Sequence, residues 1–144
     1  MLLGRYINLV NTLPLALFVR KFKTILDMGC GVNCPINYFI TSDQRLEGLD
    51  IFEDSITKQE KTKYQKIYIC DVRNFQSDSQ YELVTALDFV EHFTKEDGYK
   101  VLDKLEKIAS QRVVIITPNG FVPQAATADN PWQEHKSGWS TEDF

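Results

Sequence analysis

The 144-residue chain has few cysteines, no long hydrophobic run and no cluster of basic residues, and each scarcity excludes a class of protein. Its cysteines, Cys30, Cys34 and Cys70, are too few and odd in number for a disulfide framework. The spacing of Cys30 and Cys34 lacks the CxxC form and a second ligand pair, so the sequence predicts no metal site. Free thiols are typical of a reducing compartment, which favours a cytoplasmic location.

Hydrophobic runs fall well short of the ~20 apolar residues that a membrane span needs, so we expect no membrane partner. The apolar stretch at residues 13–19 contains Pro14 and leads into Arg20 and Lys21, which predicts a helix end that packs on the domain. Lys and Arg total 16 against 20 Asp and Glu, giving a net charge of −4. An acidic chain without a basic patch disfavours nucleic acid as a partner.

Short apolar segments alternate with longer amphipathic ones from residue 24 onward. The predicted strands are 24–28, 46–50, 66–71, 82–87 and 112–117, and the predicted helices are 33–42, 53–63 and 95–109. The segment between Asp71 and Glu82 is short and polar, which favours a loop. Strands that alternate with helices predict one α/β domain over residues 1–144, with a mostly parallel sheet covered on both faces.

Two terminal segments flank this alternating region. Residues 1–23 predict one or two short helices that lie across the sheet. Residues 121–144 predict either a polar tail or a lid over the site, and Trp132 and Trp139 argue against a fully solvated tail. Ser140 with Asp143 three residues later resembles a helix start, so we expect a helix that begins where the chain ends.

The first strand runs into the sequence DMGCG, in which Gly29 and Gly31 let the backbone turn sharply and approach a ligand. A dinucleotide-binding loop would place a third glycine at position 34, where this chain has Cys34. The carboxylate of Asp27 would also repel phosphates. The loop therefore favours a positively charged ligand over a nicotinamide dinucleotide.

Acidic residues end four predicted strands: Asp27, Asp50, Asp71 and Asp88. The carboxyl ends of parallel strands meet at one edge of the sheet, where open α/β sheets bind ligands. Asp50 follows Gly31 by 19 residues, a spacing that suits hydrogen bonds to both hydroxyls of a ribose. Each aspartate has an alternative interpretation as a cap of the turn that follows it. The shared position of all four favours a binding site.

The ordered set ILDMGCG, LEGLD, CDV, LVTALDFVEH and VVIITPNG resembles the class I S-adenosylmethionine-dependent methyltransferase family, in its small type 11-like branch. The resemblance covers residues 24–120, with weaker similarity beyond. It implies a Rossmann-like three-layer sandwich with strand order 3-2-1-4-5-7-6, of which strands 6 and 7 are missing here. It also implies S-adenosylmethionine as cofactor and S-adenosylhomocysteine as product.

By motif position, the resemblance assigns a role to each residue of the strand-end loops. Asp27 and the backbone of Gly29, Cys30 and Gly31 would hold the methionine moiety. The ribose would be bound by Asp50, and the adenine would contact Ile51, Asp71 and Val72. Leu87 and Asp88 would lie near the methionine end.

Two branches of the family, the amide and adenine N-methyltransferases, carry an Asn/Asp-Pro-Pro-aromatic motif after strand four. This chain reads LDFV there, so the sequence predicts a different small-molecule acceptor. His92 is the candidate base for that acceptor, with a structural hydrogen bond as the alternative. His135 and the two tryptophans lie in the candidate lid.

A second hypothesis is a cofactor-binding module without activity, because the missing strands normally help to build the acceptor side. A third and weaker hypothesis is a nicotinamide-dependent oxidoreductase. If strands 6 and 7 are absent, residues 112–117 form an apolar edge strand. We expect the C-terminal segment to cover that edge, or a second copy to pair with it in a homodimer.

Overall fold

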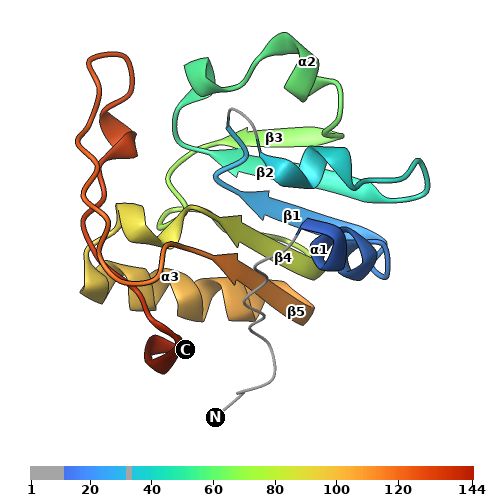
Figure 1. The fold of residues 1–144 in the computed structure, drawn as a ribbon. Helices are drawn as coiled ribbons and strands as arrows, with labels where there is room; N and C mark the ends of the chain where they lie inside the picture. The colour runs from blue at the N-terminus through green and yellow to red at the C-terminus, as the bar shows by residue number, and fades with distance from the viewer. Residues whose placement is uncertain (1–11, 32–33) are drawn as a thin grey trace.

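Five parallel strands form a single sheet in the order β3-β2-β1-β4-β5 (Figure 1). The structure, a computed structural model, describes residues 12–31 and 34–144. The strands are β1 (Thr24–Met28), β2 (Arg45–Asp50), β3 (Lys66–Ile69), β4 (Tyr81–Leu87) and β5 (Ala109–Ile116). All five predicted strands and their order are thereby confirmed.

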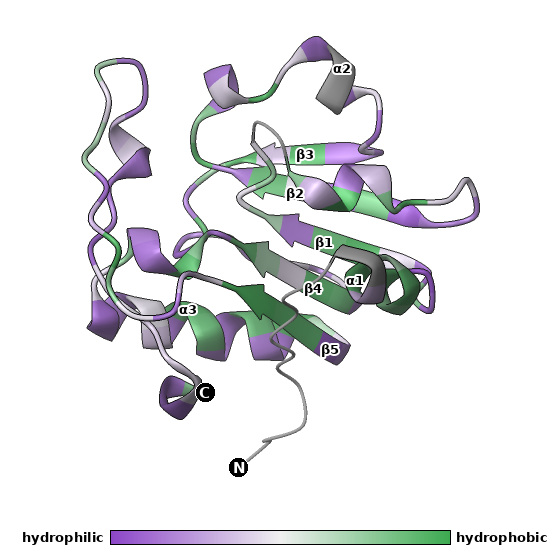
Figure 2. Cartoon of the chain, viewed as in Figure 1, coloured by the Kyte–Doolittle hydropathy of each residue, from purple (hydrophilic) through white to green (hydrophobic). Residues whose placement is uncertain are grey.

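Alternate residues of the strands point to opposite faces and build two separate cores. Ile25, Leu83 and Val114 pack on one face with α1 (Thr12–Val19) and the 3-10 helix η1 (Pro35–Tyr38). Leu26 and Val84 pack on the other face against α3 (Lys95–Ile108). Helices therefore cover both faces of the sheet, which confirms the three-layer arrangement (Figure 1). Figure 2 shows the apolar residues gathered in the strands and on the inner side of α3.

Helix α3 forms where its apolar periodicity predicts it. Its inward side buries Val101, Leu102 and Leu105 among others, and the Oγ1 of Thr94 accepts a hydrogen bond from the amide of Asp97 at 3.2 Å. This side-chain cap satisfies one of the amides that a helix start leaves unpaired. Within the described residues no helix is long and apolar enough to cross a membrane.

The other two predicted helices are wrong in extent. In place of a helix over 33–42, the described residues hold only η1, which Pro35 opens. In place of a helix over 53–63, the structure has a 3-10 helix, η2 (Glu53–Ser55), and a single turn, α2 (Lys58–Lys61). Extended backbone at Ile56 separates them. β-branched and short polar residues in both segments favour turns over a continuous helix.

The N-terminal segment contains α1 as predicted, while any helix within residues 1–11 lies outside the described part of the chain. The loop between β3 and β4 contains no helix, as its polarity predicted. Strand β5 forms one edge of the sheet. In the C-terminal segment, Trp139 forms isolated β-bridges with Asn119 and Gly120, which lie beyond the end of β5. These bridges leave the edge of β5 itself unpaired by this segment, so pairing of this strand with a second copy stays a prediction.

Candidate functional site

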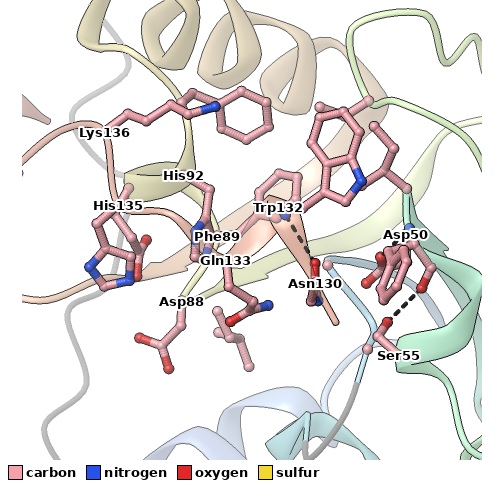
Figure 3. Close-up of a pocket in the computed structure, with 18 of the residues that line it drawn as sticks. Asp50, Ser55, Asp88, Phe89, His92, Asn130, Trp132, Gln133, His135 and Lys136 are labelled. Atoms are coloured by element: carbon pink, nitrogen blue, oxygen red, sulfur yellow. Dashed lines mark hydrogen bonds between the residues drawn. The ribbon is translucent and has the colours of Figure 1, made fainter. Parts of the chain in front are cut away.

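The loops that follow the parallel strands enclose one side of a cavity of about 930 Å³. All the strands point toward this edge, and the irregular segment 118–136 forms the opposite wall (Figures 1 and 3). Of the residues predicted to bind cofactor or to act as a base, nine line the cavity: Gly29, Gly31, Asp50, Ile51, Asp71, Val72, Leu87, Asp88 and His92. The structure therefore brings nine of the eleven predicted residues, which are spread over 64 positions of the sequence, to one cavity.

Gly29 turns the chain where β1 ends. Its φ is +72°, and a Cβ there would lie 2.6 Å from the ring of Phe89. The amides of Gly29 and Cys30 donate to the carbonyl of Leu49 at 2.8 and 3.1 Å, which ties the loop to β2. A side chain at position 29 would both strain the backbone and collide with Phe89, so the loop requires glycine.

Asp50 stands at the end of β2 with its carboxylate against the glycine loop. A Cβ on Gly31 would lie 3.0 Å from its Oδ2, and its Oδ1 accepts the amide of Phe52 at 2.8 Å. Burial raises the pKa of Asp50, while the amides of Phe52, Gly31 and Ile51 act to lower it. The carboxylate lines the cavity and has lone pairs left, so it can accept hydrogen bonds from a diol.

Asp71 lies at the start of the loop that follows β3, and its carboxylate is already paired with the guanidinium of Arg73. The Nε and Nη2 of Arg73 donate to its two oxygens, at 3.0 and 2.6 Å. This fork lowers the pKa of Asp71. Val72 is buried beside it and lines the cavity. Val72 thus gives the cavity an apolar surface, and the carboxylate of Asp71 lies beside it in a fixed position.

Asp88 ends β4 in a conformation that is uncommon for a residue with a side chain. Its φ is +48°, in the left-handed region, and its amide donates to the carbonyl of Ile116 at 2.8 Å. Aspartate tolerates this region better than most residues, at a cost in backbone strain. The side chain is exposed to the cavity, as Figure 3 shows. The strain thus places a carboxylate inside the site.

Asp27 is placed differently from its expected contact with a ligand. Its carboxylate is fully buried beneath the loop and does not line the cavity. It accepts hydrogen bonds from Thr85 Oγ1 at 2.7 Å, Tyr64 Oη at 2.8 Å and Cys34 Sγ at 2.9 Å. Burial raises the pKa of Asp27. Because three donors hold it under the loop, its position is that of a support for the loop.

Cys30 lies in the glycine loop, where its backbone was expected to hold the ligand, and its side chain points away from the cavity. The side chain is completely buried and packs in the core on the α1 face. A Cβ on Gly48 would come within 2.5 Å of its Sγ, so the thiol fills the space over that glycine. Cys30 therefore faces the sheet, and its amide serves the turn described above.

His92 is the last residue of the 3-10 helix η3 (Val90–His92) and lies beside His135, with ring centroids 5.0 Å apart. Both line the cavity, on the side of Asp88 and away from Asp50 (Figure 3). Burial lowers the pKa of His92. The Nδ1 of His92 lies 3.1 Å from the carbonyl of Glu134. A carbonyl only accepts, so Nδ1 carries the proton and the other ring nitrogen is left as an acceptor.

Segment 118–136 contains cavity-lining residues that were not predicted from the sequence. Gln124 Nε2 donates to the carbonyl of Gln133 at 2.7 Å, and Asn130 caps the 3-10 helix η4 (Pro131–Gln133) by accepting the amide of Trp132 at 3.0 Å. The bond from Gln124 to Gln133 pairs the two arms of the segment beside the cavity. Trp132, which the sequence places in the candidate lid, lines the cavity with 43% of its surface exposed. No motif marks Asn130 or Gln133, because loop residues carry no periodicity.

The fold is similar to those of several solved structures. No protein-family model and no curated protein matches the chain. Among solved structures, the magnesium protoporphyrin IX methyltransferase of Synechocystis PCC 6803 with bound S-adenosylmethionine matches with a TM-score of 0.66 at 16% identity, over 92% of this chain and 62% of that one. CalS10 of Micromonospora echinaspora, an amino pentose methyltransferase, matches with a TM-score of 0.65 at 17% identity, over 78% and 52%.

The plantazolicin methyltransferase BpumL matches with a TM-score of 0.62 at 23% identity, over 75% of this chain and 45% of that one. The chain thus spans less than two thirds of the length of each of these structures. At such identities the likeness concerns the fold. The described chain has the Rossmann-like fold of the S-adenosylmethionine-dependent methyltransferases.

Proposed function

We propose that the chain binds S-adenosylmethionine at the strand-end cavity and transfers its methyl group to a small-molecule acceptor, releasing S-adenosylhomocysteine. The observation that carries this proposal is the carboxylate of Asp50, held against the glycine loop inside the cavity. Structures of similar fold contain S-adenosylmethionine or S-adenosylhomocysteine, which supports the same cofactor here.

The lining of the cavity fits each part of that cofactor. Asp50 would accept hydrogen bonds from the ribose hydroxyls, and Ile51 and Val72 would contact the adenine. Asp71 lies at the adenine edge with its carboxylate fixed by Arg73. The backbone at Gly29 and Gly31 leaves room for the methionine moiety. Leu87 and Asp88 would lie near the methionine end of the cofactor.

Charge also favours this cofactor over a dinucleotide. A sulfonium and an α-amino group are positive, and the carboxylates of Asp50 and Asp88 line the cavity. Two phosphates would be repelled by the carboxylate of Asp88, which is exposed in the cavity. Cys34 occupies the place of the third glycine, and its thiol donates to the buried carboxylate of Asp27.

Methyl transfer demands alignment more than acid–base chemistry. The cofactor supplies a methyl group on a good leaving group, and the protein must place an acceptor atom in line with it and exclude water. Alignment of this kind contributes about 7–11 kcal/mol in favourable cases. Phe89, Phe93 and Trp132 line the cavity and supply apolar surface against which an acceptor can be held dry.

The volume of the cavity leaves space for an acceptor beside the cofactor. At about 930 Å³ it lies near the upper end of ordinary ligand pockets, roughly 300–1,000 Å³. The proposed acceptor is a small molecule. If the acceptor atom must lose a proton, the unprotonated nitrogen of His92 is the candidate base.

Replacing Asp50 tests the cofactor site. We expect Asp50→Ala to weaken the binding of S-adenosylhomocysteine by roughly 5- to 150-fold, because about 1–3 kcal/mol is lost when the ribose hydroxyls are left unpaired. Calorimetry gives the affinity of each variant. Asp54→Ala is the matched control, since Asp54 is an exposed carboxylate four residues away that does not line the cavity. Equal affinities for Asp50→Ala and the unmodified protein would reduce Asp50 to a turn cap.

A binding module without activity is the alternative proposal, since the strand-end residues that line the cavity would serve cofactor binding whether or not an acceptor is methylated. Both proposals predict binding of the cofactor. A methyl-transfer assay over a panel of hydroxyl, amine and carbon acceptors separates them. Binding of NAD in place of S-adenosylhomocysteine would favour an oxidoreductase instead.

A further inference from the structure

One cluster in the cavity has the composition of a metal site. One ligand atom from each of Glu91, His92 and His135 lies within 4.8 Å of the other two. Two ligand atoms that share an ion, each about 2.0–2.2 Å from it, lie no more than about 4.4 Å apart. The side chains therefore need only a small rotation to share one ion.

Glu91 supplies the observation that separates this cluster from a chance gathering of polar groups. Its side chain is only 2% exposed, yet its Oε1 has no hydrogen-bond partner among residues 12–31 and 34–144. The other oxygen, Oε2, accepts from Thr117 Oγ1 at 3.0 Å. A buried carboxylate oxygen without a partner is costly, and a bound cation would remove that cost.

Both imidazoles are held in a tautomer that leaves Nε2 able to bind a metal. The Nδ1 of His92 lies 3.1 Å from the carbonyl of Glu134, and the Nδ1 of His135 lies 2.7 Å from the carbonyl of Val122. Because carbonyls only accept, each Nδ1 donates and each Nε2 keeps its lone pair. A hydrogen bond from the second ring nitrogen to a carbonyl is the usual support of a metal-binding histidine.

The backbone fixes the two segments that carry these side chains. The carbonyl of Glu91 accepts the amides of Lys136 and Ser137 at 2.8 and 3.2 Å. Together with the bond from His92 to Glu134, these contacts join η3 to residues 134–137. The site is thus positioned before any ion arrives, and the carboxylate of Asp88 lies on the same side of the cavity (Figure 3).

We propose that Glu91, His92 and His135 bind a divalent transition-metal ion within the cavity. Two imidazoles and one carboxylate suit Zn²⁺ and related ions better than Mg²⁺ or Ca²⁺, which prefer oxygen ligands. Three protein ligands leave a coordination position for water or for an oxygen of a bound molecule. A bound ion takes up the lone pair of His92, so this role replaces that of a base.

Zn²⁺ binding, measured by calorimetry on the metal-free protein, tests the proposal without cofactor or acceptor. We expect one Zn²⁺ per chain, and a loss of affinity of more than about 100-fold in His135→Ala, since removal of even an outer partner costs 10–100-fold. Glu91→Gln keeps the shape of the side chain and is expected to weaken binding as well. Cys70→Ala is the matched control, because this thiol lines the same cavity and binds zinc by itself if freely accessible.

Co²⁺ provides a second readout that does not depend on affinity alone. In the unmodified protein we expect visible d–d absorption of a low-coordinate Co²⁺ ion that disappears in His92→Ala and His135→Ala. Circular dichroism of each variant shows that its fold is retained. The proposal is overturned by no Zn²⁺ binding, by unchanged binding in His135→Ala, or by binding that is lost in Cys70→Ala with both histidines present. None of these results bears on whether the cofactor binds.

Discussion

Replacing Trp139 with alanine is expected to lower the free energy of unfolding by about 3–5 kcal/mol, the usual range for a buried tryptophan. Trp139 is 1% exposed although it belongs to the irregular C-terminal segment. It stacks on Phe144 with ring centroids 5.5 Å apart, and Lys95 Nζ lies 4.0 Å from the centre of its ring. Its Nε1 donates to Ser137 Oγ at 2.8 Å. The indole therefore holds the last residues of the chain onto α3.

Gly98 of α3 makes room for this ring, because a Cβ there would lie 2.4 Å from the Cζ2 of Trp139. Urea unfolding followed by circular dichroism measures the change in stability. Trp132→Ala serves as the control, since Trp132 is 43% exposed and its loss should change stability by less than about 0.5 kcal/mol. A change below about 1 kcal/mol in Trp139→Ala would show that the C-terminal segment contributes little to the fold.

Asp27→Ala is expected to destabilise the fold by roughly 3–4 kcal/mol, while Asp27→Asn changes stability far less. The alanine variant leaves Thr85, Tyr64 and Cys34 without their buried acceptor, and each orphaned donor costs about 1–3 kcal/mol, with incomplete additivity. The asparagine variant keeps a carbonyl oxygen for Tyr64 and Cys34, and the hydroxyl of Thr85 can accept from its amide. Thermal or urea unfolding of the two variants measures the difference.

The same pair separates support of the loop from contact with the ligand. If Asp27 only supports the loop, Asp27→Asn binds S-adenosylhomocysteine with an affinity within a few-fold of the unmodified protein. A direct ion pair between Asp27 and the ligand's ammonium would instead make the asparagine variant bind much more weakly. That result would restore the contact expected from the sequence.

We expect the contribution of Asp27 to the stability of the fold to fall as the pH rises. Burial raises the pKa of this carboxyl above its value of about 3.9 in an unfolded chain. Its contribution to stability is therefore largest when it is protonated, and falls as the pH rises from about 4 through the raised value. Asp27→Asn does not titrate and should lack this component of the pH profile.

The fold was largely readable from the sequence because its strands are short apolar runs separated by polar segments. Strand order and the three layers follow from that alternation and from the resemblance of the motifs. The structure of the two short crossover segments, 33–42 and 53–63, could not be predicted. Proline at 35 and β-branched residues at 36 and 56 weaken helices there, and tertiary contacts then decide between a helix and a 3-10 turn.

The meeting of these loops at one cavity was also predictable, because parallel strands place their following loops at one edge whatever the loops contain. Asp50, Asp71 and Asp88 line the cavity for that reason. Asp27 does not, since residues within a strand alternate between faces and its side chain falls on the α1 side. Position in a motif therefore predicted where the backbone goes better than where one side chain points.

The cluster of Glu91, His92 and His135 was not predictable as a metal site. His92 and His135 are 43 positions apart and no repeat or spacing connects them. The return of the C-terminal segment to η3, through the amides of Lys136 and Ser137, brings them together. Such a contact depends on tertiary structure and leaves no local pattern.

Titration of the unmodified protein with S-adenosylhomocysteine in a calorimeter tests the central claim most directly. We predict one site per chain with a dissociation constant in the micromolar range, comparable to KM values of roughly 1 µM to 1 mM. Absence of binding up to roughly 1 mM ligand would contradict it.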